Sequence, residues 1–321
     1  MKYRTLLPHL NGKNCLTDGG LETVLIFQEG IDLPSFASFV LLDRDDGSDI
    51  LQRYFDPYAK VARDHALGLL LESPTWRANP DWATQLGYDQ RQLDCFNARA
   101  IAEMERVRSE HEADDSPMPI SGCVGTRGDG YAPASMMSPE ESAQYHDRQI
   151  NVFADSPADL VTALTIPYVD EAIGIIRAAE RHAMPVAMSF TVETNGKLPS
   201  GETLEQAITR CDAETSAYAA YYMINCAHPT HFATTLAEGG PWLNRLRGVR
   251  ANASKLSHAE LDESTELDEG NPAELGTDLK AIASKVPNLS LFGGCCGTDH
   301  RHIEHIAREV TRSSEPQAVL A

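Results

Sequence analysis

Short apolar or β-branched runs alternate along this chain with longer segments whose apolar residues recur at helical spacing. A short run of this kind, bounded by polar or turn-forming residues, predicts a buried strand, and a period near 3.6 residues predicts an amphipathic helix. Eight runs predict strands, and helical segments fall between them. The strand runs are residues 15–17, 67–71, 118–123, 160–164, 186–190, 221–226, 248–251 and 289–292.

Two segments carry helix start signals. Ser138 is followed by Pro139 and, three residues after the Ser, by Glu141, which is the pattern of a capped first turn. Thr298 is expected to cap the last helix in the same way. Eight strand–helix units without a G-x-G-x-x-G turn after the first strand favour an α/β fold of the (β/α)8 TIM-type barrel over a doubly wound sheet. No Pro-, Gly- or Ser-rich linker divides the chain, so a single barrel domain over residues 1–321 is expected.

Composition narrows the function classes. The 321 residues are 42% hydrophobic and 7% aromatic, as in a globular protein, and the formal net charge is −20. Such a charge repels nucleic acid and anionic membranes, so neither is expected as a partner. No apolar stretch approaches the ~20 residues of a membrane span. The apolar run at the N-terminus is too short to be the core of a secretory signal. Seven thinly spread cysteines then indicate reduced thiols in the cytoplasm.

Three of these cysteines lie at the ends of predicted strands. Cys226 ends the sixth strand, and Cys295 and Cys296 follow the eighth within a Gly-Gly-Cys-Cys-Gly segment. Active sites of this fold lie where the carboxyl ends of the strands meet, so the three sulfurs can converge there. A zinc site, a set of buried structural thiols and a redox-active pair of Cys295 with Cys296 all remain open at this point.

Three motifs resemble the homocysteine S-methyltransferase family over nearly the whole chain. They are the Gly-Gly-Cys-Cys-Gly segment, the strand end Asn225-Cys226, and Asp18-Gly19-Gly20-Leu21-Glu22-Thr23 near the N-terminus. The resemblance implies a barrel that holds Zn²⁺ through Cys226, Cys295 and Cys296. It also implies an amino-acid thiol as methyl acceptor, with Asp18 near the acceptor's ammonium group. Gly19 allows the backbone to approach that ligand closely, and Asn225 is a further substrate-binding candidate.

The chain departs from the family pattern at the fourth strand. Family members usually carry a Glu-Thr-Ile-Pro-like motif there, whose Glu holds the amino group of homocysteine, whereas this chain has Leu164 at that position. Glu193, just past the fifth strand, is the nearest replacement in chain order. We therefore expect Glu193 to point into the barrel mouth and to bind the ammonium group. Glu72, which ends the second strand, is a weaker candidate for a substrate contact.

The resulting prediction is a zinc-dependent S-methyltransferase. It moves a methyl group from a small sulfonium, ammonium or similar donor to the thiol of homocysteine or a relative, which makes methionine. No general base is required, so no catalytic residue is assigned beyond the zinc site. The alternatives are a redox protein that uses the Cys295–Cys296 pair and a zinc-binding barrel without catalysis. The expected partners are the two small molecules, and the sequence is also compatible with a homo-oligomer.

Overall fold

A computed structural model describes residues 1–312 of the chain. Its strands are all parallel and form one sheet in the order β2-β1-β9-β8-β7-β6-β5-β4-β3. Their bounds are β1 Cys15–Leu16, β2 Gly68–Leu69, β3 Leu71–Glu72, β4 Ile120–Gly125, β5 Leu160–Ile166, β6 Val186–Phe190, β7 Tyr221–Ala227, β8 Leu246–Ala251 and β9 Leu291–Gly294.

The sheet closes on itself through one short segment, which carries both β2 and β3. β2 pairs with β1, β3 pairs with β4, and the amide of Leu70 between them donates to the carbonyl of Leu16. The two labels therefore mark one strand position, and the ring has the eight positions that the sequence predicts. The (β/α)8 class is confirmed.

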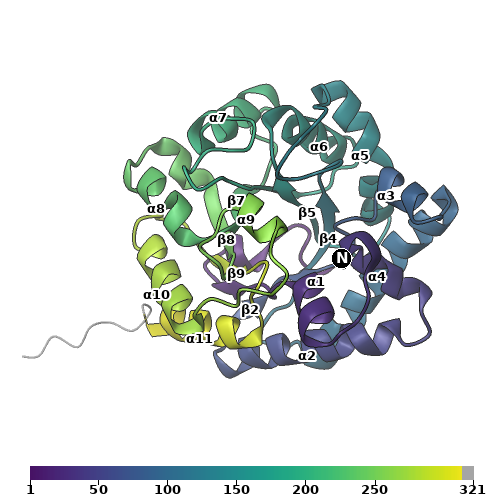
Figure 1. The fold of residues 1–321 in the computed structure, drawn as a ribbon, viewed down its shortest axis with the longest axis horizontal. Coiled ribbons are helices and arrows are strands. Elements are labelled where there is room, and N and C mark those ends of the chain that lie inside the picture. Colours follow the sequence, from purple (N-terminus) through teal and green to yellow (C-terminus); the bar gives the residue numbers. More distant parts are fainter. Residues whose placement is uncertain (313–321) are drawn as a thin grey trace, which may run out of the picture.

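Within residues 1–312, eight longer helices follow the eight strand positions and surround the sheet (Figure 1). Three short helices, α1, α3 and α9, lie instead in the loops that follow strands. The longer helices are α2 Gly47–Asp64, α4 Gln90–His111, α5 Pro139–Ala154, α6 Val169–Arg181, α7 Leu204–Glu214, α8 Pro229–Ala237, α10 Pro272–Ala283 and α11 His300–Arg312. The short ones are α1 Leu21–Thr23, α3 Pro80–Gln85 and α9 His258–Asp262.

Of the two predicted helix caps, one is confirmed and one is wrong. Ser138 caps α5 and exchanges both capping-box hydrogen bonds with Glu141, as expected. The prediction of Thr298 as the cap of α11 is wrong, because Asp299 Oδ1 accepts the hydrogen bond from the Arg301 amide. Thr298 instead donates its hydroxyl to the carbonyl of Cys295, 2.7 Å away. It thereby fixes the turn that carries the cysteines rather than the helix.

Two apolar layers support the barrel. The larger fills the space between the sheet and the helices, while a smaller one includes Leu70, Leu160, Tyr221 and Leu291 from different strands. With the strands packed on both sides, only their carboxyl ends and the following loops are left to build a site. Among residues 1–312, no helix combines the length and the apolar character that crossing a membrane requires.

Candidate functional site

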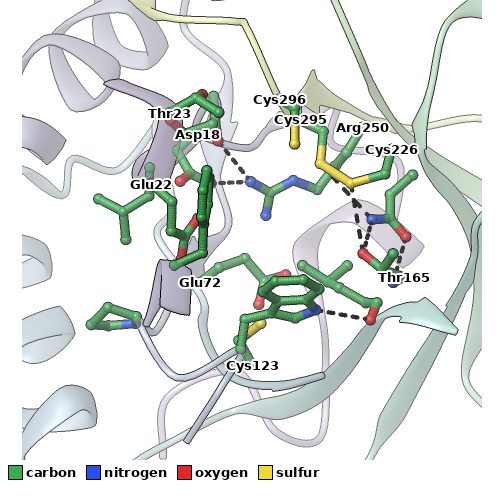
Figure 2. Close-up of a pocket in the computed structure, with 18 of the residues that line it drawn as sticks. Asp18, Glu22, Thr23, Glu72, Cys123, Thr165, Cys226, Arg250, Cys295 and Cys296 are labelled. Atoms are coloured by element: carbon green, nitrogen blue, oxygen red, sulfur yellow. Dashed lines mark hydrogen bonds and ion pairs between the residues drawn. A yellow bond between two sulfur atoms is a disulfide. The ribbon is translucent and has the colours of Figure 1, made fainter. Parts of the chain in front are cut away.

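The three predicted cysteines meet at the carboxyl end of the barrel. Cys226 is the penultimate residue of β7, and Cys295 and Cys296 directly follow β9. The three Sγ atoms all lie within 4.8 Å of one another. They line a central pocket together with Asp18, Glu72 and Arg250, among other residues (Figure 2). Residues far apart in the sequence thus form one sulfur cluster, as the strand-end argument predicts.

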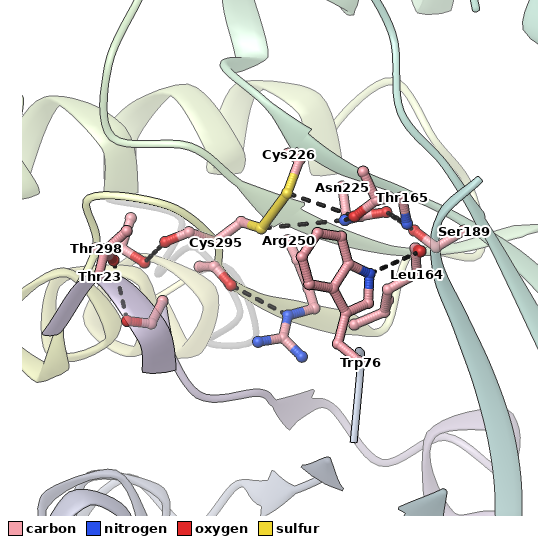
Figure 3. Close-up of a disulfide and its surroundings, with 12 residues drawn as sticks. Thr23, Trp76, Leu164, Thr165, Ser189, Asn225, Cys226, Arg250, Cys295 and Thr298 are labelled. Atoms are coloured by element: carbon pink, nitrogen blue, oxygen red, sulfur yellow. Dashed lines mark hydrogen bonds between the residues drawn. A yellow bond between two sulfur atoms is a disulfide. The ribbon is translucent and has the colours of Figure 1, made fainter. Parts of the chain in front are cut away.

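Cys226 and Cys295 are joined as a disulfide, and Cys296 is free (Figure 3). This corrects the expectation that every cysteine is a reduced thiol, and the redox alternative that pairs Cys295 with Cys296. The Cα atoms of Cys226 and Cys295 are 5.5 Å apart, within the usual range for a disulfide. Consecutive residues have Cα atoms only ~3.8 Å apart, so the vicinal pair is poorly placed for such a bond.

Strand pairing is irregular at two places beside the cysteine cluster. The β5–β6 register shifts between Ala163 and Ile166, and the β7–β8 register shifts between Asn225 and Ala227. Within these shifts Thr165 and Cys226 have φ angles of 61° and 54°. Left-handed backbone is unfavourable for residues with a side chain, and β-bulges of this kind commonly re-aim side chains at active sites.

Asn225 holds the two irregular segments together. Its Oδ1 accepts hydrogen bonds from the Thr165 amide at 2.8 Å and the Ser189 hydroxyl at 2.7 Å, and its Nδ2 donates to Thr165 Oγ1 at 2.8 Å. Nδ2 also lies 4.0 Å from Cys295 Sγ. Asn225 lines the pocket, and its hydrogen bonds give it the geometry of a positioning residue. The predicted substrate contact stays a prediction.

Asp18 lies in the pocket wall as an ion pair. Its Oδ1 is 2.7 Å from Nη2 of Arg250, and its Oδ2 accepts a hydrogen bond from the Tyr54 hydroxyl at 3.0 Å. Burial raises the pKa of Asp18, and the Arg250 charge opposes that shift. The Gly19 carbonyl accepts from the same Nη2, and a Cβ at Gly19 would lie 2.6 Å from the Thr298 carbonyl oxygen. Asp18 thus faces a protein cation before any substrate arrives.

Sequence reasoning missed Arg250, which lies on β8 and is 5% exposed. The signal was present, since a charged residue interrupts the apolar run of a strand that is buried on both faces. Burial lowers the pKa of Arg250, but the carboxylates of Asp18 and Glu72 outweigh it, so the pKa is raised overall. Arg250 is therefore a permanent positive charge inside the pocket.

Glu72, at the end of β3, is the pocket carboxylate without a partner. It is 5% exposed, and neither carboxylate oxygen makes a hydrogen bond of good geometry among the described residues, although the Ser121 and Thr162 hydroxyls lie near enough to lower its pKa. Burial raises its pKa to about 7, and the Arg250 charge only partly offsets the shift. By contrast, the partly buried Glu22 accepts a hydrogen bond from the Ser38 hydroxyl at 2.7 Å.

The structure corrects the prediction for Glu193. This residue does not line the central pocket, and its Oε1 lies 3.5 Å from Nδ1 of His258. Its amide donates to the Lys197 carbonyl, which closes a turn just after β6. Leu164 does line the pocket, as the departure from the family motif requires. Of the two candidate glutamates, Glu72 lines the pocket and Glu193 does not.

The raised pKa of Glu72 predicts a pH-dependent gain in stability for Glu72→Gln. The folded protein favours the neutral carboxyl, so the contribution of Glu72 to stability is greatest below pH 4.5 and is lost as the pH rises to about 7. At pH 8 the Gln variant should be more stable than the wild type by on the order of 2 kcal/mol.

Urea unfolding of the reduced, metal-free proteins at pH 5 and pH 8 measures this effect. Glu193→Gln is the control for a glutamate outside the pocket. An equal stability change for Glu72→Gln at the two pH values would contradict the assignment of Glu72 as a desolvated carboxyl.

A second cavity adjoins the central pocket. The two share Thr23, Phe36, Trp76, Tyr131 and Cys296. The outer cavity adds Phe27, Asp262 at the end of α9, and Glu266 and Asp268 of the loop that follows. The cysteine cluster therefore lies between an inner pocket with charged groups and an outer cavity with aromatic and acidic walls.

The donor set fits a metal ion that prefers sulfur ligands. Three sulfur atoms within 4.8 Å of one another match a thiolate zinc site, and the adjoining pocket leaves space for a fourth ligand. Burial raises the pKa of Cys296 to about 11, so that thiol is protonated near neutral pH unless a cation displaces its proton. His228 and His231 stay outside the cluster: His228 caps α8, and His231 Nε2 is hydrogen-bonded to the Lys255 carbonyl.

Comparison with known proteins gives concordant results. The family model described as homocysteine S-methyltransferase matches residues 15–310. Homocysteine S-methyltransferase 3 of Arabidopsis thaliana is 26% identical over 219 residues, which are 64% of this chain and 61% of that protein. Betaine–homocysteine S-methyltransferase 1 of Rattus norvegicus is 26% identical over 193 residues, which are 55% of this chain and 46% of that protein. The matched part thus spans less than two thirds of these relatives.

Solved structures share the fold. The metallated form of the homocysteine methyltransferase MmuM from Escherichia coli superposes with a TM-score of 0.72 at 16% identity, covering 94% of this chain and 99% of that one. The oxidized form of the same protein superposes with a TM-score of 0.73 at 18% identity, covering 94% of this chain and 98% of that one. At 16% and 18% identity these structures support only the barrel fold, and the assignment to a family rests on the family model.

Proposed function

This chain belongs to the homocysteine S-methyltransferase family, and from that membership we propose that it is a zinc-dependent thiol methyltransferase. It transfers a methyl group from a cationic donor to the sulfur of homocysteine or a related thiol, which yields methionine or its analogue. The observation that carries this proposal is the cluster of Cys226, Cys295 and Cys296 beside a buried pocket with charged walls. Cys226, Cys295 and Cys296 would hold the zinc.

The chemistry needs an ionised acceptor sulfur. A free thiol with a pKa of ~8.5 is ionised by only a few per cent near neutral pH, and a bound zinc ion would hold it as thiolate. The protein's own contribution is position and exclusion of water. Asn225 and Thr165 fix the Cys226 segment, and the apolar side chains of Leu164 and Trp76 line the pocket. The acceptor sulfur then attacks the donor methyl, and the neutral donor residue leaves.

The outer cavity supports a donor with a positive charge. Phe27, Phe36 and Tyr131 line this cavity together with acidic residues of α9 and of the loop after it. Arg77 also lines it and lies over the Trp76 ring at 4.9 Å, which adds one positive charge to that wall. Aromatic faces attract sulfonium and quaternary ammonium groups, and carboxylates add to that attraction. A methyl group held there lies beside Cys296, which both cavities share. A sulfonium or quaternary ammonium donor is therefore favoured over a neutral one.

The test is methionine formation from homocysteine by the zinc-loaded protein with a panel of donors. The panel comprises S-methylmethionine, glycine betaine and S-adenosylmethionine, with a neutral methyl thioether as the control. Turnover with a cationic donor, lost on chelation and restored by zinc, supports the proposal. Absence of turnover with every donor while zinc is bound would favour a zinc-binding barrel without catalysis.

The disulfide predicts that metal binding depends on reductant. A sulfur in the Cys226–Cys295 bond carries no thiolate to offer a metal. Protein isolated without reductant should bind less than a tenth of the zinc that the reduced protein binds. A loss of that size is expected because the disulfide removes two of the three sulfur ligands at once. Thiol titration and metal analysis of the same samples measure both quantities. Equal zinc content in the oxidised and reduced samples would contradict the ligand assignment.

A cytosol would supply that reductant, so we also propose the cytoplasm as the working compartment. Titrating the protein with glutathione buffers and following zinc content tests this. The proposal requires zinc to be retained at the potential of a reducing cytosol. Loss of zinc at that potential would argue against it.

A further inference from the structure

We propose that Glu72 and Arg250 bind the two charged ends of an α-amino acid acceptor. Glu72 would accept hydrogen bonds from the ammonium group, and Nη1 of Arg250 would donate to the carboxylate. This inference rests on the proposed function, because it assigns the substrate class of the same pocket. It replaces the roles that the family resemblance implies for Asp18 and for a glutamate at the Leu164 position.

The first argument is the state of Glu72. Both carboxylate oxygens are shielded from solvent and make no hydrogen bond of good geometry among residues 1–312. The Ser121 and Thr162 hydroxyls lower its pKa from nearby, but they are hydrogen-bonded to each other and provide no positive charge. An ionised carboxylate in that state is costly to bury, because it has lost its contacts with water and has gained no charged partner in their place. Such a cost is expected where a ligand supplies the missing partner. The residue lines the pocket that the three cysteines also line.

The second argument is the state of Arg250. Its Nε donates to the Gly294 carbonyl at 3.1 Å, and its Nη2 serves both Asp18 Oδ1 and the Gly19 carbonyl. Nη1 is buried and has no partner in the described part of the chain. These contacts fix the guanidinium plane, and one nitrogen of a rigid donor group is left over. A guanidinium nitrogen in this state suits a carboxylate oxygen.

The third argument is the relation between the two groups. Arg250 and Glu72 act on each other electrostatically, yet they form no ion pair within 4.0 Å among the ion pairs of the described residues. Figure 2 shows the Arg250 side chain extending across the pocket toward Asp18, with the cysteines and Glu72 around the same space. A ligand with one positive and one negative end satisfies both groups. A simple amine or a simple acid leaves one of them unpaired.

The other carboxylates are less available for an ammonium group. Asp18 is engaged by Arg250 and Tyr54, and Glu22 by Ser38. Leu164 offers only an apolar side chain. A zwitterionic head group between Glu72 and Arg250 would leave its side chain free to extend toward the cysteine cluster, as a thiol acceptor requires.

Methionine and two analogues test head-group recognition without any methyl transfer. Titration calorimetry on reduced, metal-free protein compares methionine with 3-(methylthio)propylamine, which lacks the carboxylate, and with 4-(methylthio)butanoate, which lacks the ammonium group. We expect methionine to bind at least tenfold more tightly than either analogue. A preference below tenfold over either one, including no detectable binding of methionine, would overturn the proposal.

Two variants assign the groups. Glu72→Gln should weaken methionine binding at least tenfold and shrink the preference for methionine over 4-(methylthio)butanoate. Arg250→Lys keeps a cation beside Asp18 but removes the guanidinium nitrogens, so it should shrink the preference over 3-(methylthio)propylamine instead. Glu193→Gln is the control and should keep both preferences. Circular dichroism and unfolding curves confirm that each variant is folded, and preferences equal to wild type in Glu72→Gln would overturn the assignment.

The test separates this inference from the proposed function. If the protein prefers methionine over both analogues as expected but methylates no thiol, the methyltransferase proposal fails and the amino-acid site stands. If homocysteine is methylated at equal kcat/KM by wild type and Glu72→Gln, the methyltransferase proposal stands and the role of Glu72 fails.

Discussion

Replacing Cys295 by Ala is expected to remove the bound zinc and to lower kcat/KM for thiol methylation by at least ~10³-fold. Loss of thiol ionisation alone accounts for a factor of about 30, because a free thiol is only a few per cent thiolate near neutral pH. The variant also no longer holds the acceptor sulfur in place. Holding two reactants in the right orientation can raise a reaction rate by several powers of ten, and part of that gain would be lost. Asn225 Nδ2 lies 4.0 Å from the Cys295 sulfur.

Metal analysis and methionine formation measure the two losses on the same preparation. Cys211→Ala is the matched control, because Cys211 is a fully buried cysteine on α7 that does not line the pocket. We expect that variant to keep zinc and turnover and to lose only stability. Full zinc retention by Cys295→Ala would refute the ligand set, and zinc loss by Cys211→Ala would show that the effect is not specific to the cluster.

The second large effect is expected for Arg250→Met. This change leaves Asp18 and Glu72 buried without their shared cation, and removing one member of a buried ion pair typically costs about 3–5 kcal/mol. The two carboxyls can escape part of the cost by taking up protons. The free energy of unfolding should therefore fall more at pH 8 than at pH 5.

The double variant Asp18→Asn/Arg250→Met separates charge from packing. Removing both partners should recover a large part of the stability that Arg250→Met loses, since no unpaired Asp18 charge remains. Urea unfolding of the four proteins of this cycle gives the coupling energy directly. Additive losses, with a coupling energy near zero, would mean that Arg250 acts through packing and not through its ion pair with Asp18.

The barrel and the cysteine cluster were accessible from the sequence for one physical reason. Strands buried on both faces are continuous apolar runs, so their ends are visible, and parallel strands bring all such ends to one rim. Cys226, Cys295 and Cys296 each stand at such an end. Knowing the ends was enough to bring the three sulfurs together.

Residues beyond a strand end were harder to place. Glu193 lies three residues after β6, and the turn closed by its own amide carries its side chain toward His258. No periodicity describes such a turn. Glu72 lies within β3, where alternation does fix the direction, and there the structure finds a carboxylate in the pocket. The disulfide could not be predicted, because it depends on the distance between a sulfur on β7 and one in the loop after β9.

The left-handed backbone at Thr165 and Cys226 has a consequence for transplanting this site into another scaffold. Each φ near +60° costs on the order of 1 kcal/mol or more for a residue with a side chain, and Asn225 holds both segments in place. Copying only the cysteines onto the rim of a regular barrel would leave Cys226 on ordinary extended backbone, aimed elsewhere. An engineer would have to carry over the asparagine and both register shifts, so the smallest portable unit spans β5 and β7 as well as the loop after β9.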